Sequence, residues 1–121
     1  MADKVAADVL VPRLDVHPLD VSAVGADLLA EAERTGCSRF PVIDGDLDHV
    51  VGVVHVKSLL TISRTARDLT PISELMAPAL AVPETRALDG LMDDLRAART
   101  AMAVVVDEHG GTAGLVTEED V

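Results

Sequence analysis

Residues 103–120 read AVVVDEHGGTAGLVTEED, and this stretch decides the fold. It opens with an apolar run of mainly β-branched residues that ends at Asp107, as strands prefer. Glycines and acids of the kind that hairpin turns use follow at once, and a second short apolar run covers 113–116. The stretch therefore predicts a strand, a tight turn and a second strand, with a helix starting near Thr117.

The same pattern occurs in the first half of the chain, where residues 40–54 read FPVIDGDLDHVVGVV. The apolar runs that end in Asp44 and Asp107 are offset by 63 residues, and Gly52 and Gly114 are offset by 62. A further pair of matching stretches, 7–12 (ADVLVP) and 73–78 (SELMAP), has an offset of 66. Landmarks that recur in the same order indicate an internal repeat.

Each half also carries one amphipathic helical pattern between its landmarks. Ser22 is the expected cap of the first helix and Gly36 its expected stop, while Thr85 is the expected cap of an apolar stripe over 88–95. In the first half, 57–62 reads as a further short helix. Each half thus predicts strand–helix–strand–strand–helix, an α/β (α+β) fold.

These patterns also suggest where the repeats begin and end. We expect repeat 1 over residues 1–62, a polar linker over 63–71, and repeat 2 over 72–121. The sequence of repeat 2 stops where its last helix should begin, so we expect that helix to be truncated.

Composition excludes several classes of function. The 121 residues include 10 Lys+Arg and 21 Asp+Glu, and this net charge of -11 disfavours nucleic acid and anionic membrane surfaces as partners. Phe40 is the single aromatic residue, so a planar ligand would have to lie between aliphatic side chains and backbone. The lone Cys37 excludes an internal disulfide, and we expect it to be a small buried residue. No apolar run approaches the ~18–20 residues that cross a bilayer, so we expect a soluble intracellular domain.

Asp120 lies one turn into the helix that we expect from Thr117, and its chemistry suits a ribose. Both carboxylate oxygens can accept hydrogen bonds from a vicinal diol, while the Thr117 hydroxyl and the N–H groups of a helix start can bind phosphate. The alternative without a ligand is a capping box, because Thr-x-x-Asp also stabilises a helix start.

Two other polar clusters are candidate sites. Arg39, in the sequence 38–41 (SRFP), can bind a phosphate through its guanidinium or be an ordinary surface arginine. The stretch Asp107–His109 has neither a second histidine at helical spacing nor a Cys-x-x-Cys pair, which favours a solvated turn over a metal or acid–base site. The sequence pairs no nucleophile with a base, so we expect no catalytic residues, no metal ligands and no enzyme.

Taken together, four stretches resemble a known family: 38–42 (SRFPV), 52–57 (GVVHVK), 82–85 (VPET) and 106–120 (VDEHGGTAGLVTEED). The chain resembles the CBS-domain pair (Bateman module) of the CorC/hemolysin-like family, whose relatives include the CNNM magnesium transporters. The resemblance covers almost the whole chain. It implies tandem CBS repeats that pack with pseudo-twofold symmetry and leave two clefts for adenosine nucleotides.

The resemblance also implies which residues form one of these clefts. Asp120 would bind the ribose and Thr117 a phosphate, while residues 10–12 would lie close to the adenine. Arg39 and Pro41 of the other repeat would complete the cleft. The implied ligand-binding residues are Asp120, Thr117, Arg39, Pro41, Ser38, Leu10, Val11 and Pro12.

By resemblance the chain is a regulatory module that binds ATP or AMP, with Mg²⁺ held through the phosphates. It would serve an attached transmembrane domain, outside this chain, that moves magnesium or cobalt, and it would lie on the cytoplasmic face of the plasma membrane as a homodimer. The alternative is a structural dimerisation module with no functional nucleotide site. A metal-dependent hydrolase using Asp107 and His109 is the least favoured reading.

The sequence departs from the family pattern at several positions. His55 and Ser58 stand where repeat 2 has Thr117 and Asp120, and a serine cannot accept two hydroxyls as a carboxylate does. We therefore expect the second cleft to be weak or empty. His109 replaces the family's usual tyrosine, and Glu118, in place of its usual leucine, adds a negative charge.

Overall fold

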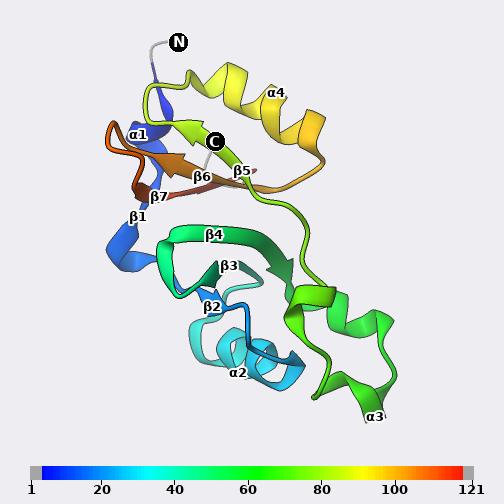
Figure 1. The fold of residues 1–121 in the computed structure, drawn as a ribbon. Helices are drawn as coiled ribbons and strands as arrows, with labels where there is room; N and C mark the ends of the chain where they lie inside the picture. Colours follow the sequence, from blue (N-terminus) through cyan, green and yellow to red (C-terminus); the bar gives the residue numbers. More distant parts are fainter. Residues whose placement is uncertain (1–3, 119–121) are drawn as a thin grey trace. The chain divides into compact units, whose positions relative to one another are not determined.

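The computed structural model describes residues 4–118 of the chain (Figure 1). The chain forms two compact units. Unit 1 combines Met1–Val16 with Ala79–Val121, and unit 2 is the continuous stretch His17–Pro78. Unit 1 is therefore assembled from two pieces that are far apart in the sequence.

Unit 1 contains a four-stranded sheet in the order β1-β7-β6-β5, with helix α4 along one face (Figure 1). Strands β5 and β6 are parallel, while β6–β7 and β1–β7 are antiparallel. Its elements are α1 (Ala6–Val9), β1 (Val11–Pro12), η1 (Arg13–Asp15), β5 (Leu80–Pro83), α4 (Leu88–Ala98), β6 (Met102–Val106) and β7 (Thr112–Thr117).

The core of unit 1 lies between α4 and the sheet. Leu91 and Leu95, from the predicted apolar stripe, are fully buried there with Val105 and Val116. Ala6 of α1 belongs to the same core and is also fully buried. Ala6 is thus part of a core whose other fully buried members come from the second half of the chain.

Unit 2 contains a three-stranded sheet in the order β2-β3-β4, in which β2–β3 is parallel and β3–β4 antiparallel. Leu28 of α2 packs against Phe40, Val42 and Val54 of the sheet, and Ile72 closes the same core. Its elements are β2 (Leu19–Asp20), α2 (Gly25–Thr35), β3 (Arg39–Asp44), β4 (Asp46–His55), η2 (Val56–Thr61), α3 (Arg64–Arg67) and η3 (Ile72–Glu74).

The strands predicted from the apolar runs at 40–44, 51–54, 103–107 and 113–116 are confirmed, but the predicted helix starts are wrong. Helix α2 begins at Gly25, after Val24, whose N–H donates to Asp27 Oδ2 at 2.9 Å. The Ser22 hydroxyl bonds instead to a carboxylate in its own turn, and Thr85 lies before the start of α4. The N-cap residue is therefore Val24, whose N–H is held by the first-turn carboxylate of Asp27, and not Ser22. Gly36 ends α2 as expected, with φ 76°.

Segment 7–12 docks on the sheet of unit 1 through a close backbone contact. Val11 and Pro12 of β1 pair with Leu115 and Gly114 of β7. A Cβ added to Gly114 would lie only 2.1 Å from the carbonyl oxygen of Val11. Glycine at this position therefore lets the two backbones approach each other.

Unit 2 repeats this contact at the matching positions. Ala77 bridges Val53 of β4, with both N–H···O distances at 2.8 Å. A Cβ on Gly52 would lie 2.8 Å from the carbonyl oxygen of Ala77. The two matched glycines of the sequence repeat thus have the same physical role.

The compact units divide the chain differently from the sequence repeats. Segment 7–12, assigned to repeat 1, packs in unit 1, and segment 73–78, assigned to repeat 2, packs in unit 2. Within the expected linker 63–71, residues 64–67 form α3, and Gly25 N–H donates to Thr70 O at 2.8 Å. The repeat boundaries at 62 and 72 remain a prediction about the sequence. Over residues 4–118, no helix has the length and apolar character needed to cross a bilayer.

Replacing Gly114 by alanine should destabilise the protein by about 1–3 kcal/mol, because backbone atoms of Val11 would have to move away. Gly90→Ala in α4 is the matched control. The nearest atoms there belong to the flexible end of the Arg86 side chain. Alanine is also more favourable than glycine inside a helix by about 1 kcal/mol. Urea unfolding followed by circular dichroism measures the free energy of unfolding of both variants. An equal decrease in the two would contradict the role given to Gly114.

The Asp20 carboxylate joins the β2–α2 turn to the β3–β4 turn. It accepts hydrogen bonds from the Ser22 hydroxyl (2.6 Å), the Ser22 N–H (3.1 Å) and the Gly45 N–H (3.1 Å). These bonds, with that from the Ser22 hydroxyl the strongest, hold the pKa of Asp20 below its ordinary value. The ionised carboxylate therefore stabilises the fold above the unfolded pKa of about 3.9, and this contribution is lost as the pH falls through the lower folded-state pKa.

Asp20→Ala should accordingly lower the melting temperature at neutral pH and have a smaller effect below pH about 3. The exposed residue Glu33 supplies the control, Glu33→Ala. Thermal melts of the three proteins across this pH range test the prediction. The prediction would be refuted if the melting temperature of Asp20→Ala stayed below that of the unchanged chain by the same amount down to the lowest pH.

Candidate functional site

Thr117 is the last residue of β7, where it pairs with Met102 of β6, and it is partly exposed. Directly after β7, the Glu118 N–H donates to Ala101 O at 2.9 Å. Asp120, the predicted ribose-binding residue, lies outside the described residues. The position of Thr117 at a strand end leaves its hydroxyl at the rim of the sheet.

The predicted adenine contacts lie on the neighbouring edge strand. Leu10 ends α1, with its N–H donating to Ala6 O at 3.1 Å, and Val11 and Pro12 form β1. Because β1 and β7 are antiparallel, Leu10 lies toward the end of β7 that carries Thr117. The structure therefore brings four predicted site residues, Thr117 and 10–12, to one edge of one sheet.

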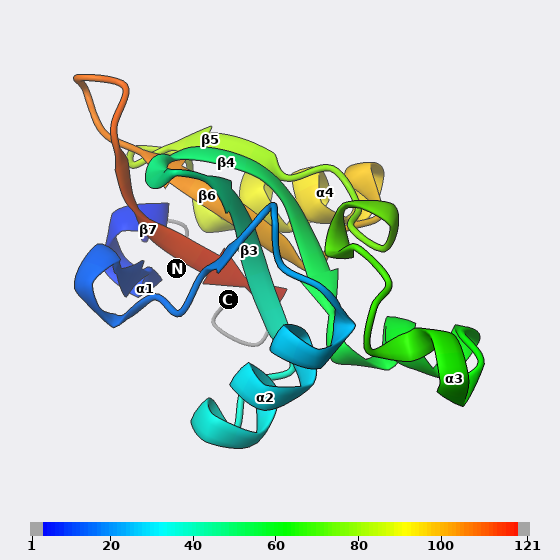
Figure 2. The same ribbon diagram turned by 60° about the horizontal axis from the view of Figure 1, so that its bottom comes forward.

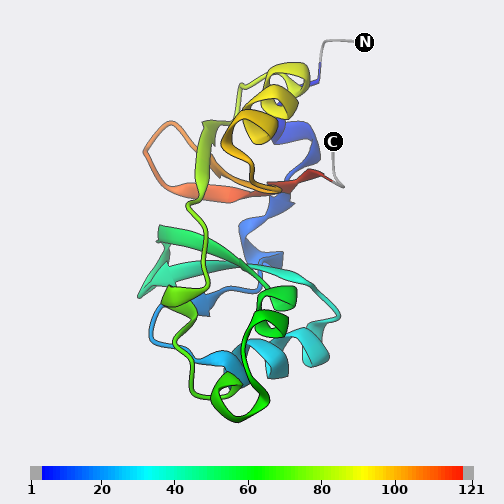
Figure 3. The same cartoon turned by 90° about the vertical axis from the view of Figure 1, so that its right-hand side faces the viewer.

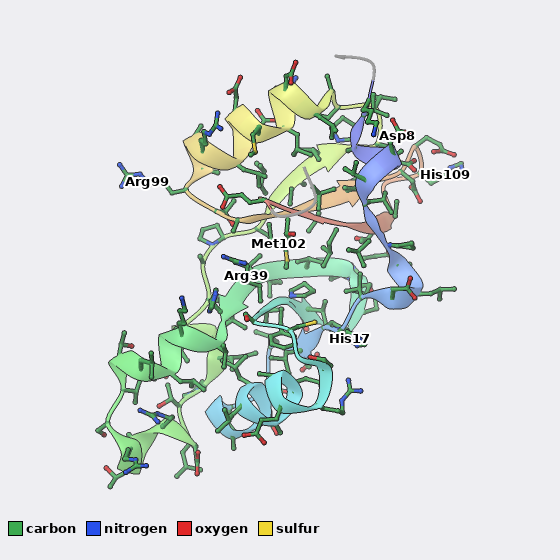
Figure 4. The ribbon with its side chains drawn as sticks, turned by 180° about the vertical axis from the view of Figure 1, so that it is seen from behind. Asp8, His17, Arg39, Arg99, Met102 and His109 are labelled. Atoms are coloured by element: carbon green, nitrogen blue, oxygen red, sulfur yellow. The ribbon has the colours of Figure 1, made fainter. Side chains whose placement is uncertain are left out.

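The other predicted residues, Ser38, Arg39 and Pro41, belong to unit 2. Arg39 opens β3 opposite His55 of β4, and Figure 4 shows its side chain there. The carbonyl of Ser38 accepts a hydrogen bond from Val56 N–H at 2.8 Å. Ser38 is exposed and Pro41 is fully buried. A cleft shared by these residues and Thr117 remains a prediction.

Unit 2 has a strand end that matches the one at Thr117. His55 ends β4 as Thr117 ends β7, and the Val53–Ala77 bridge corresponds to the Leu115–Val11 pair. His55 Nδ1 accepts a hydrogen bond from Lys57 N–H at 3.0 Å, and the Ser58 hydroxyl donates to the carbonyl of His55. These polar groups are thus engaged within their own turn.

Residues 76–78 are absent from the predicted site, although they are the counterparts of 10–12. The sequence feature that could have pointed to residues 76–78 is the match between segments 7–12 and 73–78 at an offset of 66 residues. It shows that the segments correspond, but it does not show which sheet each segment joins.

Asp107 organises the turn between β6 and β7. Its Oδ1 accepts hydrogen bonds from the N–H groups of His109 and Gly111, both at 2.9 Å. His109 is exposed on this loop, which extends beyond the sheet (Figures 2 and 4). The interpretation of Asp107–His109 as a solvated turn therefore agrees with the structure. In the described part of the chain no three His, Cys, Asp or Glu residues are grouped so that they could hold a metal ion.

Cys37 is exposed, and the expectation that it is buried was wrong. It follows Gly36, whose left-handed conformation turns the chain away from α2, and its N–H donates to Thr35 Oγ1 at 3.1 Å. The residue belongs to the turn that leads to β3 and not to the core. Composition gives no indication of this, because free cysteines are usually buried.

Known proteins support a single assignment. The CBS domain family matches residues 6–64. The UPF0053 protein MT1890 of Mycobacterium tuberculosis is 42% identical over 116 residues, which cover 96% of this chain and 26% of that protein. The magnesium and cobalt efflux protein CorC of Escherichia coli is 34% identical over 121 residues, which cover all of this chain and 41% of CorC. The chain thus spans only about a quarter to two fifths of these relatives.

One solved structure has the same fold over nearly the full length of this chain. The CBS domain of the bacterial CNNM/CorC family Mg²⁺ transporter in complex with ATP is 35% identical, with a TM-score of 0.92. The match covers 98% of this chain and 84% of that one. With its mixed α/β fold and its sequence, the chain belongs to the CBS domains of the CNNM/CorC family.

Proposed function

We propose that this chain is a regulatory CBS module that binds an adenosine nucleotide, ATP or AMP, and has no catalysis of its own. It would serve a CorC-like membrane protein that moves magnesium or cobalt. One observation carries the proposal: the solved CBS domain that matches 98% of this chain is in complex with ATP. The pairing of β1 with β7, which brings 10–12 to the edge that ends at Thr117, adds support.

In this proposal each group of residues binds one part of the nucleotide. The Thr117 hydroxyl binds a phosphate, residues 10–12 contact the adenine, and Asp120 binds the ribose. Ser38, Arg39 and Pro41 of unit 2 complete the site, with the Arg39 guanidinium on the phosphates.

The adenine is held by aliphatic side chains and backbone, without an aromatic platform. Phe40 is the one aromatic residue of the chain, and its side chain is fully buried in the core of unit 2. Leu10 and Val11, both partly exposed, offer an apolar surface beside the strand end. Affinity for the base then depends on shape and on backbone hydrogen bonds.

Negative charge near the strand end favours the magnesium complex of ATP. Glu118 is exposed directly after Thr117, and two more acids follow it in the sequence. One carboxylate about 8 Å from a phosphate costs roughly 1 kcal/mol at an effective dielectric of about 40. Arg39 alone does not offset such repulsion for a triphosphate, whereas a bound divalent cation does.

The matching strand end of unit 2 is proposed to bind nucleotide weakly or not at all. His55 and Ser58 occupy the positions of Thr117 and Asp120 in the sequence repeat. The Ser58 hydroxyl already donates to the carbonyl of His55, and the His55 ring caps η2 through Lys57 N–H. A second ligand would have to compete with these local hydrogen bonds.

The setting of the module is also part of the proposal. The chain would be attached to a transmembrane domain, lie on the cytoplasmic face of the plasma membrane, and form a homodimer through its CBS modules. The net charge of -11 disfavours nucleic acid as a partner.

Asp120→Ala should weaken ATP binding by at least about a hundredfold, because two hydrogen bonds to a charged carboxylate are lost. Ser58→Ala, at the matching position of the other repeat, is the control and should leave the affinity unchanged. Titration calorimetry with the Mg²⁺ complex of ATP measures both. Comparable losses would show that the assignment of the site to Thr117 and Asp120 is wrong.

ATP should bind at least about tenfold more weakly when Mg²⁺ is removed with a chelator, because the carboxylates then face unneutralised phosphates. AMP, with a single phosphate, should depend much less on the metal. The same calorimetric titrations with and without Mg²⁺ test this prediction. Equal affinity of ATP in the two buffers would contradict it.

A structural dimerisation module without a nucleotide site gives a different result. A ligand that binds the folded chain must raise its melting temperature. If ATP, ADP, AMP and adenosine all leave the melting temperature unchanged at millimolar concentration with Mg²⁺ present, the regulatory proposal fails and the structural alternative replaces it.

A further inference from the structure

His55 and Arg39 are cross-strand neighbours at one end of the unit 2 sheet. They are paired in the antiparallel register of β3 and β4. The hydrogen bond from Val56 N–H to Ser38 O (2.8 Å) flanks this pair, which makes it a pair of the non-hydrogen-bonded type. Side chains come closest in such pairs, with Cβ atoms about 4.5–5.5 Å apart. Groups from both side chains can therefore reach the same ligand.

The pair lies on the sheet face that α2 does not cover. The next pair along the two strands, Phe40 and Val54, is fully buried in the core against α2. Figure 3 shows α2 and η2 side by side on that face of the sheet. Because side chains alternate between the two faces of a sheet, Arg39 and His55 lie on the opposite face, where both are partly exposed. Both residues therefore belong to the surface of unit 2 and not to its core.

The cap of η2 determines which nitrogen of the His55 ring carries the proton. Nδ1 accepts a hydrogen bond from Lys57 N–H at 3.0 Å, so the hydrogen of the neutral ring is on Nε2. The Arg39 guanidinium likewise has donors and no acceptor. A pair of side chains that presents donors suits an acceptor, and a phosphate oxygen is an acceptor whose charge also complements that of Arg39.

The charges around this strand end are positive, although the chain as a whole is acidic. Lys57 is exposed two residues after His55, and the stretch 49–67 contains no Asp or Glu. A local excess of positive charge attracts an anion. The corresponding pair of unit 1, Met102 and Thr117, combines a buried methionine with a hydroxyl and has no cation. The pairing of a cation with an imidazole is thus particular to unit 2.

We propose that His55 is a specificity-determining residue of the nucleotide site, where its Nε2–H donates to the same phosphate that Arg39 binds. This inference rests on the proposed function, which assigns Arg39 to the phosphates. The ring keeps its cap when it does so, because the cap uses Nδ1 and the phosphate uses Nε2. His55 then serves the one proposed site and not a second one. It raises the affinity for nucleotides that carry phosphate and does not affect the affinity for adenosine.

Two replacements of His55 separate the cap from the phosphate contact. In His55→Asn the side-chain oxygen can still accept from Lys57 N–H, but the side chain is too short to place a donor where Nε2 lies. This variant should bind ATP at least about tenfold more weakly at an unchanged melting temperature, because a hydrogen bond to a charged acceptor is lost. His55→Gln retains an N–H donor at the reach of Nε2 and loses the cap. It should keep the ATP affinity of the unchanged chain and melt a few degrees lower.

Adenosine is the control ligand, and His49→Asn is the control variant. His49 is an exposed histidine nearer the other end of β4, and its replacement should change neither affinity. Adenosine carries no phosphate, so its affinity should be the same for all of these proteins. Calorimetric titrations in the presence of Mg²⁺ measure the affinities, and thermal melts measure the stability. If His55→Asn weakens ATP and adenosine binding equally, or leaves both unchanged, the phosphate role of His55 is wrong.

Arg39→Met tests whether the two side chains bind the same phosphate. Unit 1 has a methionine, Met102, at the corresponding position. Arg39→Met combined with His55→Asn should weaken ATP binding by less than the product of the two separate factors, because both side chains contact one group. Losses that multiply in full would overturn the shared contact.

The unchanged chain distinguishes a failure of this inference from a failure of the proposed function. If it binds ATP and the His55 variants do not behave as expected, the role of His55 is wrong and the nucleotide site remains. If it binds neither ATP nor adenosine, the proposed function fails, and the role of His55 fails with it.

Discussion

The carbonyl oxygen of Val11 lies against the backbone of β7 at a point where any side chain larger than a hydrogen atom would collide with it. This contact allows β1 to pair with β7, and that pairing makes the four-stranded sheet of unit 1 complete. It also keeps Ala6 in the core and holds Leu10 near the strand end at Thr117. The core and the candidate site of unit 1 thus depend on the same glycine.

The two units keep this geometry and differ in chemistry. In unit 2 the Ala77–Gly52 contact plays the same role, and the strand ends at His55 in place of Thr117. A histidine ring that caps the following turn replaces a hydroxyl at the rim of the sheet. Duplicated backbone contacts can therefore be retained for stability while the polar groups beside them diverge, so that one half can specialise in a ligand.

Strands and the order of the repeat could be predicted from the sequence because β-branched runs and turn residues act locally. The helix starts could not, since Ser22 bonds to Asp20 in the preceding turn and α2 begins two residues later, after Val24, whose N–H donates to Asp27. Nor could the sheet that segment 7–12 joins, because pairing with β7 involves residues about a hundred positions away. The burial of Arg67 Nε could not be predicted either, because it depends on the packing of α3 against Gly25.

The discontinuity of unit 1 has a consequence for biosynthesis. Unit 2 is continuous, so all of its residues have been translated before β5 is made. Strand β1, by contrast, has no pairing partner until β7 has been translated. Segment 7–12 therefore stays unpaired while the roughly one hundred residues between it and β7 are translated, and its pairing with β7 then closes a loop in the chain that contains all of unit 2.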